Sequence, residues 1–197
     1  MAINRFQQIG IWTIAITLTV GTIGSFVAIV LANENARVDQ TTQQEEYEKQ
    51  LAEFEKQQQE QAKANAASAE PLDGYSAAAF DGSAVTELAV AVLKEGTGPE
   101  VSSTDSISAS YFGWLADGTI FDSSNKKDVD DTPVTFPLSG VIAGWTEGLA
   151  GQKVGSVVEL TIPAEKAYGP NGSGIIPANA PLKFIVIIQS IAPQETV

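Results

Sequence analysis

The chain has 197 residues and a net charge of −13, and it contains neither histidine nor cysteine. Without imidazole or thiol groups, the sequence excludes Ser-His-Asp and Cys-His nucleophiles, histidine-ligated metals, disulfides and thiol redox chemistry. The acidic balance, with no basic stripe, also argues against nucleic acid as a partner, because a phosphate backbone would be repelled.

Residues 9–32 contain no charged side chain in 24 positions. As a helix this run would be roughly 36 Å long, which is enough to cross a hydrocarbon core of about 30 Å. Arg5 precedes the run and Glu34 is the first charge after it, so the positive-inside rule places the remainder of the chain outside the cytoplasm. We therefore predict an N-terminal membrane anchor over residues 1–32, attached through this transmembrane helix.

A cleaved signal peptide is the alternative for the same segment. The sequence "VLA" at residues 30–32 fits the small-residue cleavage rule, although the apolar run is longer than the roughly 7–15 residues of a signal peptide. In that case the protein would be secreted, and the rest of the chain would again lie outside the cytoplasm.

Residues 33–70 are rich in Gln, Glu, Lys and Ala and contain no Gly or Pro, a composition that favours helix. Tyr47, Leu51 and Phe54 share one helical face, but three apolar residues are too few for a sustained coiled coil. We expect a charged spacer that is helical or partly disordered. A weak self-association or partner-docking helix is the alternative.

Residues 71–197 have the composition of a folded domain, with short apolar runs between turn residues. The runs "ELAVAVLKEG", "SISASYFGW", "SVVELTI" and "LKFIVIIQSI" read as strands, and alternation in the second predicts one buried face. Only "VIAGWTEGLAG" (141–151) reads as a short helix, with Gly151 near its end. The expected fold class is α+β, an antiparallel sheet with a helix on one face.

The stretch "AYGPNGSGIIPANAPL" (167–182) is a loop by its Gly, Pro and Asn content, yet it holds the adjacent pair Ile175 and Ile176. Adjacent residues cannot easily face one core, so at least one isoleucine should point toward a cleft.

The acidic run around Asp128, Asp130 and Asp131 lacks the calcium-loop pattern, and we interpret it as a solvated loop rather than a metal site. Ser123 and Ser124 have no base in this chain to activate them. We therefore expect neither a metal site nor a serine nucleophile.

Three further motifs, together with the strand "AVLKEGTG", resemble the macrolide-binding FKBP family of peptidyl-prolyl cis–trans isomerases. They are "YFGWLADGTIFDSS" (111–124), "VIAGWTEGLAGQKVGSVVELTIP" (141–163) and "AYGPNGSGIIPANAPLKFIV" (167–186). All four lie in family order over roughly residues 89–192. The resemblance implies a five-stranded antiparallel sheet wrapped around one short helix, a pocket between them and no cofactor. The partners it implies are proline-containing polypeptides and macrolide inhibitors.

The resemblance also implies roles for individual residues. Trp145 would form the pocket floor, with Asp122 beside the pocket and the Tyr168 hydroxyl directed at a substrate carbonyl. The remaining residues that it assigns to the pocket are the aromatic walls Tyr111, Phe121 and Phe184, the edge residues Val141 and Ile142, and the rim residues Ile175 and Ile176.

Two departures from the family pattern bear on the pocket. Val134 stands where the family often has an aromatic wall residue, so the pocket should be wider there. The segment between Ser124 and Pro133 is longer than in compact members, which leaves Lys126 and Lys127 as alternative partners of Asp122.

The sequence therefore predicts an isomerase that assists the folding of extracytoplasmic proteins by binding the twisted X-Pro amide. One alternative is a non-catalytic holdase module of the same fold that is tethered to the membrane. Another is a membrane-tethered structural protein whose working part is the helix within residues 33–70.

Overall fold

The computed structural model describes residues 40–127, 129 and 131–192. Contacts divide the chain into two units, Met1–Phe54 and Glu55–Val197, and the boundary falls inside helix α2 (Gln40–Ser68). The membrane-anchor prediction for residues 9–32 lies outside the described residues. Within the part that the structure describes, no helix is both long and apolar enough to cross a bilayer.

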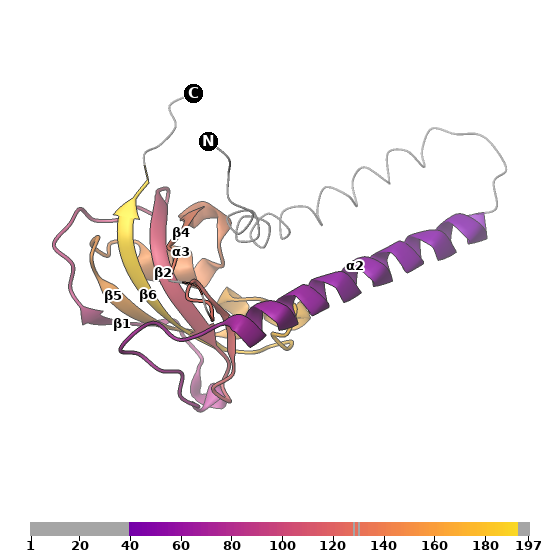
Figure 1. The fold of residues 1–197 in the computed structure, drawn as a ribbon, viewed down its shortest axis with the longest axis horizontal. Coiled ribbons are helices and arrows are strands. Elements are labelled where there is room, and N and C mark those ends of the chain that lie inside the picture. Colours follow the sequence, from indigo (N-terminus) through magenta and orange to yellow (C-terminus); the bar gives the residue numbers. More distant parts are fainter. Residues whose placement is uncertain (1–39, 128, 130, 193–197) are drawn as a thin grey trace, which may run out of the picture. The chain divides into compact units, whose positions relative to one another are not determined.

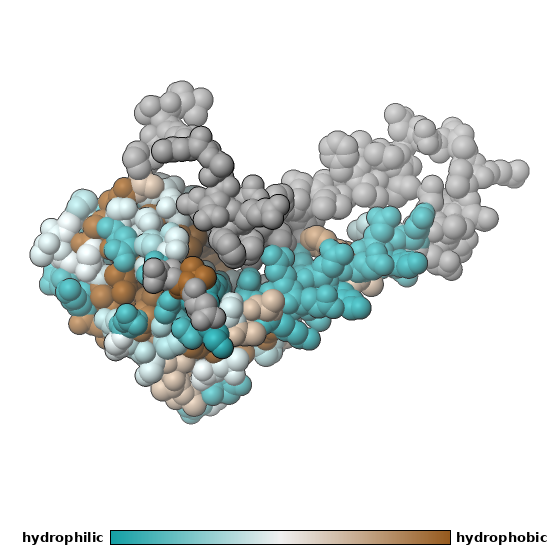
Figure 2. Space-filling model, in the orientation of Figure 1, coloured by the Kyte–Doolittle hydropathy of each residue, from teal (hydrophilic) through white to brown (hydrophobic). Residues whose placement is uncertain are grey.

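Within the predicted spacer, helix α2 covers residues 40–68. Its sequence has many helix formers and no helix breaker, and its surface is predominantly hydrophilic in Figure 2. Tyr47 and Leu51, two members of the thin apolar stripe, remain 43% and 42% exposed.

One antiparallel sheet forms the body of the second unit (Figure 1). The strand order is β1-β5-β6-β2-β3, and β4 also pairs with β2. The strands are β1 (Ala89–Lys94), β2 (Ser106–Trp114), β3 (Ile120–Ser123), β4 (Val134–Pro137), β5 (Val157–Ile162) and β6 (Leu182–Ile191). The described residues also form the 3₁₀ turns η1 (Gly82–Ala84), η2 (Leu138–Gly140), η3 (Ala164–Lys166) and η4 (Gly169–Asn171).

The expectation of five strands is wrong in one respect, because the sheet has six. Strand β2 pairs through Ser106–Ala109 with β4 and through Phe112–Trp114 with β3, both along the same edge. The long segment between Ser124 and Pro133 separates these two short strands. One edge of β2 therefore carries two partners in succession.

Helix α3 (Ala143–Leu149) is shorter than the 141–151 segment that predicts it. Val141 is extended and Ile142 is the N-cap residue, while Ala150 is extended again at the other end. Gly151, at φ 82°, supplies the left-handed residue expected after the helix. A Cβ at Gly144 would overlap the Ile162 side chain, so this glycine lets α3 lie close against β5.

The prediction that β2 buries only one face is wrong for its second half. Ile107 and Ala109 are fully buried, but so are Ser110 and Phe112 on the opposite side. Residues 71–80 cover that second face: Leu72 joins Phe112, Trp114, Val157 and Ile185 in a core cluster, with Tyr75, Ala77 and Phe80 packed against it. The sheet is therefore covered on both faces, by α3 on one and by the segment after α2 on the other.

Candidate functional site

Five aromatic side chains from five different elements meet on the face of the sheet that carries α3. Trp145 of α3 lies at the centre, with its ring centroid 5.2 Å from each of Tyr111, Phe136 and Phe184. Phe121 packs edge-to-face on Phe184 at 5.4 Å. We call these five residues the aromatic cluster. It unites four of the five aromatic residues that the family resemblance assigns to the pocket, namely Tyr111, Phe121, Trp145 and Phe184.

Phe136 is the member of the cluster that the sequence reasoning missed. It lies on β4, two residues after Val134, and only 2% of it is exposed. Alternation along Val134, Phe136 and Leu138 is the signal that could have found it, since the last two are buried and Val134 is half-buried. Val134 pairs with Ala109 of β2. It is the first residue of β4, directly after the long loop that leads into this strand.

The indole N–H of Trp145 is buried and has no hydrogen-bond partner among the described residues. Leaving such a donor unpaired costs about 1–3 kcal/mol, so the site holds a polar group that is poised for an acceptor. Its surroundings are otherwise aromatic and apolar. The cluster thus offers a low-polarity surface with one unsatisfied donor.

Asp122, on β3, connects Tyr111 of the aromatic cluster to Lys126, which lies outside the cluster. The Tyr111 hydroxyl donates to Asp122 Oδ2 at 2.6 Å, and Lys126 Nζ donates to Oδ1 at 3.0 Å. Lys126 rather than Lys127 is therefore the basic partner, and Lys127 is exposed. Burial raises the pKa of Tyr111 well above its usual value, and the charge of Asp122 and their hydrogen bond raise it further.

Tyr168 stands at the head of the glycine-rich loop, where it precedes η4. Burial, and secondarily the charge of Asp122, raises the pKa of Tyr168 to about 12, so its hydroxyl stays protonated at neutral pH. The charge of Asp122 contributes to the raised pKa of both Tyr111 and Tyr168. Among the described residues, however, no ring contact joins Tyr168 to Trp145.

The two isoleucines of the loop differ in exposure. Ile176 is 8% exposed, whereas Ile175 is half-buried. The two isoleucines lie in a tight turn. The Ser173 N–H donates to the Ile176 carbonyl at 3.0 Å, and the Ile176 N–H donates to the Ser173 carbonyl at 2.8 Å. Of the two, Ile175 keeps the larger accessible surface.

Val141 and Ile142 lead into α3, and both are half-buried. The Ile142 carbonyl accepts the backbone N–H groups of Trp145 and Thr146, at 2.9 and 3.3 Å. The N–H of Ile142 itself precedes the first intrahelical bond, as the leading N–H groups of any helix do. It is therefore a donor that the helix does not use.

The serines and acids after β3 have structural partners. Ser123 Oγ donates to the Glu70 carbonyl at 2.6 Å, and Ser124 Oγ donates to Asp131 Oδ1 at 2.7 Å. Asp131 therefore accepts side-chain hydrogen bonds, which the interpretation of this run as a solvated loop did not include. Asp128 and Asp130 lie outside the described residues. Within residues 40–127, 129 and 131–192, no three acidic side chains converge closely enough to hold a metal ion.

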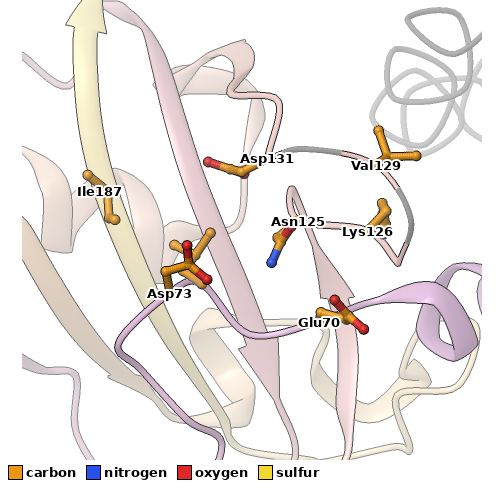
Figure 3. Close-up of a pocket in the computed structure, with 8 residues that line it drawn as sticks. Glu70, Asp73, Asn125, Lys126, Val129, Asp131 and Ile187 are labelled. Atoms are coloured by element: carbon orange, nitrogen blue, oxygen red, sulfur yellow. The ribbon is translucent and has the colours of Figure 1, made fainter.

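A polar hollow of about 540 Å³ is lined in part by the loop that follows β3 (Figure 3). It shares no residue with the aromatic cluster, and it lies between residues 70–73 and residues 125, 126, 129 and 131. Its lining residues are Glu70, Leu72, Asp73, Asn125, Lys126, Val129, Asp131 and Ile187.

Known proteins are similar to this chain in its second unit, Glu55–Val197. The profile of the FKBP-type peptidyl-prolyl cis-trans isomerase family matches residues 98–189. The FK506-binding protein of Neisseria meningitidis serogroup B is 43% identical over 100 residues, which cover 50% of this chain and 91% of that protein.

Two longer relatives match over a similar region. The FKBP-type peptidyl-prolyl cis-trans isomerase FkpA of Aeromonas hydrophila is 47% identical over 100 residues, which cover 51% of this chain and 36% of that protein. The outer membrane protein MIP of Legionella longbeachae is 40% identical over 101 residues, which cover 51% of this chain and 42% of the relative. The matched region thus spans less than half the length of these two relatives.

Proposed function

This chain belongs to the FKBP-type peptidyl-prolyl cis-trans isomerase family, and we propose that it catalyses the cis–trans isomerisation of X-Pro bonds in polypeptides. The observation that carries the proposal is the aromatic cluster around Trp145, with its unpaired indole N–H and the neutral hydroxyls of Tyr111 and Tyr168 nearby. The match of residues 98–189 to the isomerase family and the 47% identity to the isomerase FkpA of Aeromonas hydrophila support the same activity.

The reaction requires no nucleophile, base or metal. Rotation about an X-Pro bond is slow because it breaks amide resonance, with a barrier of about 18–20 kcal/mol. A catalyst has only to bind the twisted amide better than the planar one. The twisted amide separates less charge, so the low-polarity surface of the aromatic cluster favours it over water.

The proposed roles follow from the positions of the side chains. Trp145 supports the proline ring, and the unused N–H of Ile142 and the Tyr168 hydroxyl donate to substrate carbonyls. Asp122 holds Tyr111 and Lys126 in place. Apolar contacts with the substrate come from Phe121, Val134, Val141, Ile175, Ile176 and Phe184.

The site of action that we propose lies outside the cytoplasm, with the isomerase unit of residues 71–197 carried on the spacer and anchored through residues 1–32. The apolar run at residues 9–32 supports this location, and so does the similarity to a relative that is named an outer membrane protein. Secretion after signal-peptide cleavage is the alternative. We further propose that macrolide inhibitors of the family bind at the aromatic cluster.

The decisive test is an isomerisation assay on the full chain in detergent, which measures the cis–trans relaxation of an Ala-Xaa-Pro-Phe peptide. We expect relaxation to be faster than the uncatalysed rate and to slow when a family macrolide is added. Relaxation at the background rate would overturn the proposal. If the peptide bound without acceleration, the holdase alternative, which Val134 favours by widening the pocket, would replace it.

A further inference from the structure

The end of helix α2 touches the glycine-rich loop that carries Tyr168. A Cβ placed on Gly174 would lie only 2.5 Å from the Cβ of Ala62, so the loop backbone rests directly on the helix at this point. Ala62 is half-buried, whereas the neighbouring Lys63 and Ala64 are exposed. The contact is thus confined to one face of the helix and needs small residues on both sides.

The same helix end is anchored to the loop that follows β3. The Lys127 N–H donates to the Ser68 carbonyl at 2.8 Å, which satisfies one of the terminal carbonyls that a helix leaves unpaired. The Glu70 N–H donates to the Asn125 carbonyl at 3.1 Å, and Asn125 Nδ2 donates to the Pro71 carbonyl at 2.9 Å.

Residues 68–71 are therefore joined to residues 123–127 by a series of hydrogen bonds. Ser123 Oγ adds its bond to the Glu70 carbonyl, and Ala69 and Lys126 form an antiparallel bridge. Figure 3 shows Glu70 beside Lys126 and Asn125 in this region. These hydrogen bonds hold the C-terminal end of α2 in place. They lie about two helical turns after Ala62.

The glycine-rich loop needs such support. Gly169, Gly172 and Gly174 all have positive φ, at 58°, 65° and 57°, and glycine loses more conformational freedom on ordering than any other residue. The loop nonetheless has to present Tyr168 and Ile175 in fixed positions if both contact substrate.

We propose that residues 62–71 act as a brace that positions the Tyr168 loop, with Ala62 as the positioning residue that acts through Gly174. The inference rests on the proposed isomerase function. The brace sets the substrate-contacting residues of the loop and leaves the Trp145 floor unaffected. Disturbing it therefore raises KM while kcat changes little.

Two glycines of the loop provide a matched comparison on the full chain. Gly174→Ala places a methyl against Ala62 at φ 57°, whereas Gly169→Ala has nearly the same φ, 58°, with no atom within 4 Å of the new methyl. We expect Gly174→Ala to raise KM at least fivefold more than Gly169→Ala. Adding Ala62→Gly to Gly174→Ala should remove the clash and return KM to the level of Gly169→Ala. Equal KM values for the two alanine variants, or no rescue by Ala62→Gly, would overturn the brace.

A second pair keeps the proposal testable if the loop variants fold poorly. Ala62→Val and Ala64→Val add the same β-branched side chain to the same helix, but only residue 62 faces the loop. We expect a raised KM in Ala62→Val alone. The same rise in both variants would show a general effect of the helix and overturn the proposal.

Amide hydrogen exchange separates failure of the brace from failure of the proposed function. Exchange at residues 169–176 should be faster in Ala62→Val than in Ala64→Val whether or not the parent protein accelerates isomerisation. An inactive parent with this difference would refute the function and keep the brace. Identical exchange in the two variants would refute the brace alone.

Discussion

Two buried tryptophans, on opposite faces of one sheet, differ in the hydrogen bonding of the indole N–H group. Trp114 and Trp145 are 3% and 5% exposed, and each packs against another aromatic ring at 5.1–5.2 Å. The Trp114 indole N–H donates to the Ala78 carbonyl at 2.9 Å, whereas the Trp145 indole N–H has no partner among the described residues. The face with the satisfied donor is closed by residues 71–80, and the face with the unsatisfied donor carries the proposed site.

The core cluster around Trp114 and the aromatic cluster around Trp145 therefore differ in the hydrogen bonding of the tryptophan and not in the types of residue that form them. Both clusters are aromatic and well packed, so burial alone would not distinguish them. An unpaired buried donor costs free energy of folding, and such a cost is expected where the group has a role in binding.

The largest effect on stability should follow from Trp114→Ala. It deletes a buried aromatic side chain and leaves the Ala78 carbonyl unpaired, so we expect the free energy of unfolding to fall by about 3–5 kcal/mol. Urea unfolding measures the loss. The folded fraction should keep the parental kcat/KM. A large drop in kcat/KM per folded molecule would show that the two faces are not independent.

Trp145→Leu should reverse this pattern. We expect kcat/KM to fall about a hundredfold, which corresponds to about 2.7 kcal/mol of transition-state stabilisation. The loss of unfolding free energy should be smaller than for Trp114→Ala, because the change also removes an unpaired buried donor. Isomerisation kinetics and urea unfolding on the same preparation test both parts. An unchanged kcat/KM would remove Trp145 from the site.

Asp122→Asn should have an intermediate effect. The change removes the negative charge that accepts the Tyr111 hydroxyl and pairs with Lys126, and we expect kcat/KM to fall about tenfold, or about 1.4 kcal/mol. The pKa of Tyr111 should fall but stay above its usual value, because burial is the larger cause of its rise. Asp117→Asn is the matched control in an exposed turn, and its activity should equal that of the parent.

The remaining effect is absent at neutral pH and develops only at alkaline pH. The pKa of Tyr168 is raised to about 12, so between about pH 10 and 12 the unfolded chain loses this proton while the folded chain keeps it. The unfolded state then binds fewer protons, and stability falls with rising pH by up to about 1.4 kcal/mol per pH unit for this one group. Below pH 10 the group contributes no slope. Tyr168→Phe should unfold with a shallower decline over this range, and an identical decline would place Tyr168 in solvent.

Much of the site is predictable because it depends on local pattern and ordered motifs. Trp145 and Phe184 could be assigned to the pocket because each lies in a motif that resembles the family. The choice between Lys126 and Lys127 does not, because adjacent residues of a loop differ in direction only after the loop has folded. Phe136 was missed for a related reason: its strand is only four residues long, so the alternation of Val134, Phe136 and Leu138 is a weak signal until the strand pairs with β2.

The sequence by itself indicated the α+β fold class and the glycine-rich loop, and the absence of histidine and cysteine excluded imidazole- and thiol-dependent chemistry. Contacts between distant segments decided the rest. The covering of the second face of β2 depends on residues 71–80, and the contact of Ala62 with Gly174 joins positions more than a hundred residues apart. A hydrophobic pattern shows that a side chain will be buried, but only the packed molecule shows against what, and whether its polar atoms find partners.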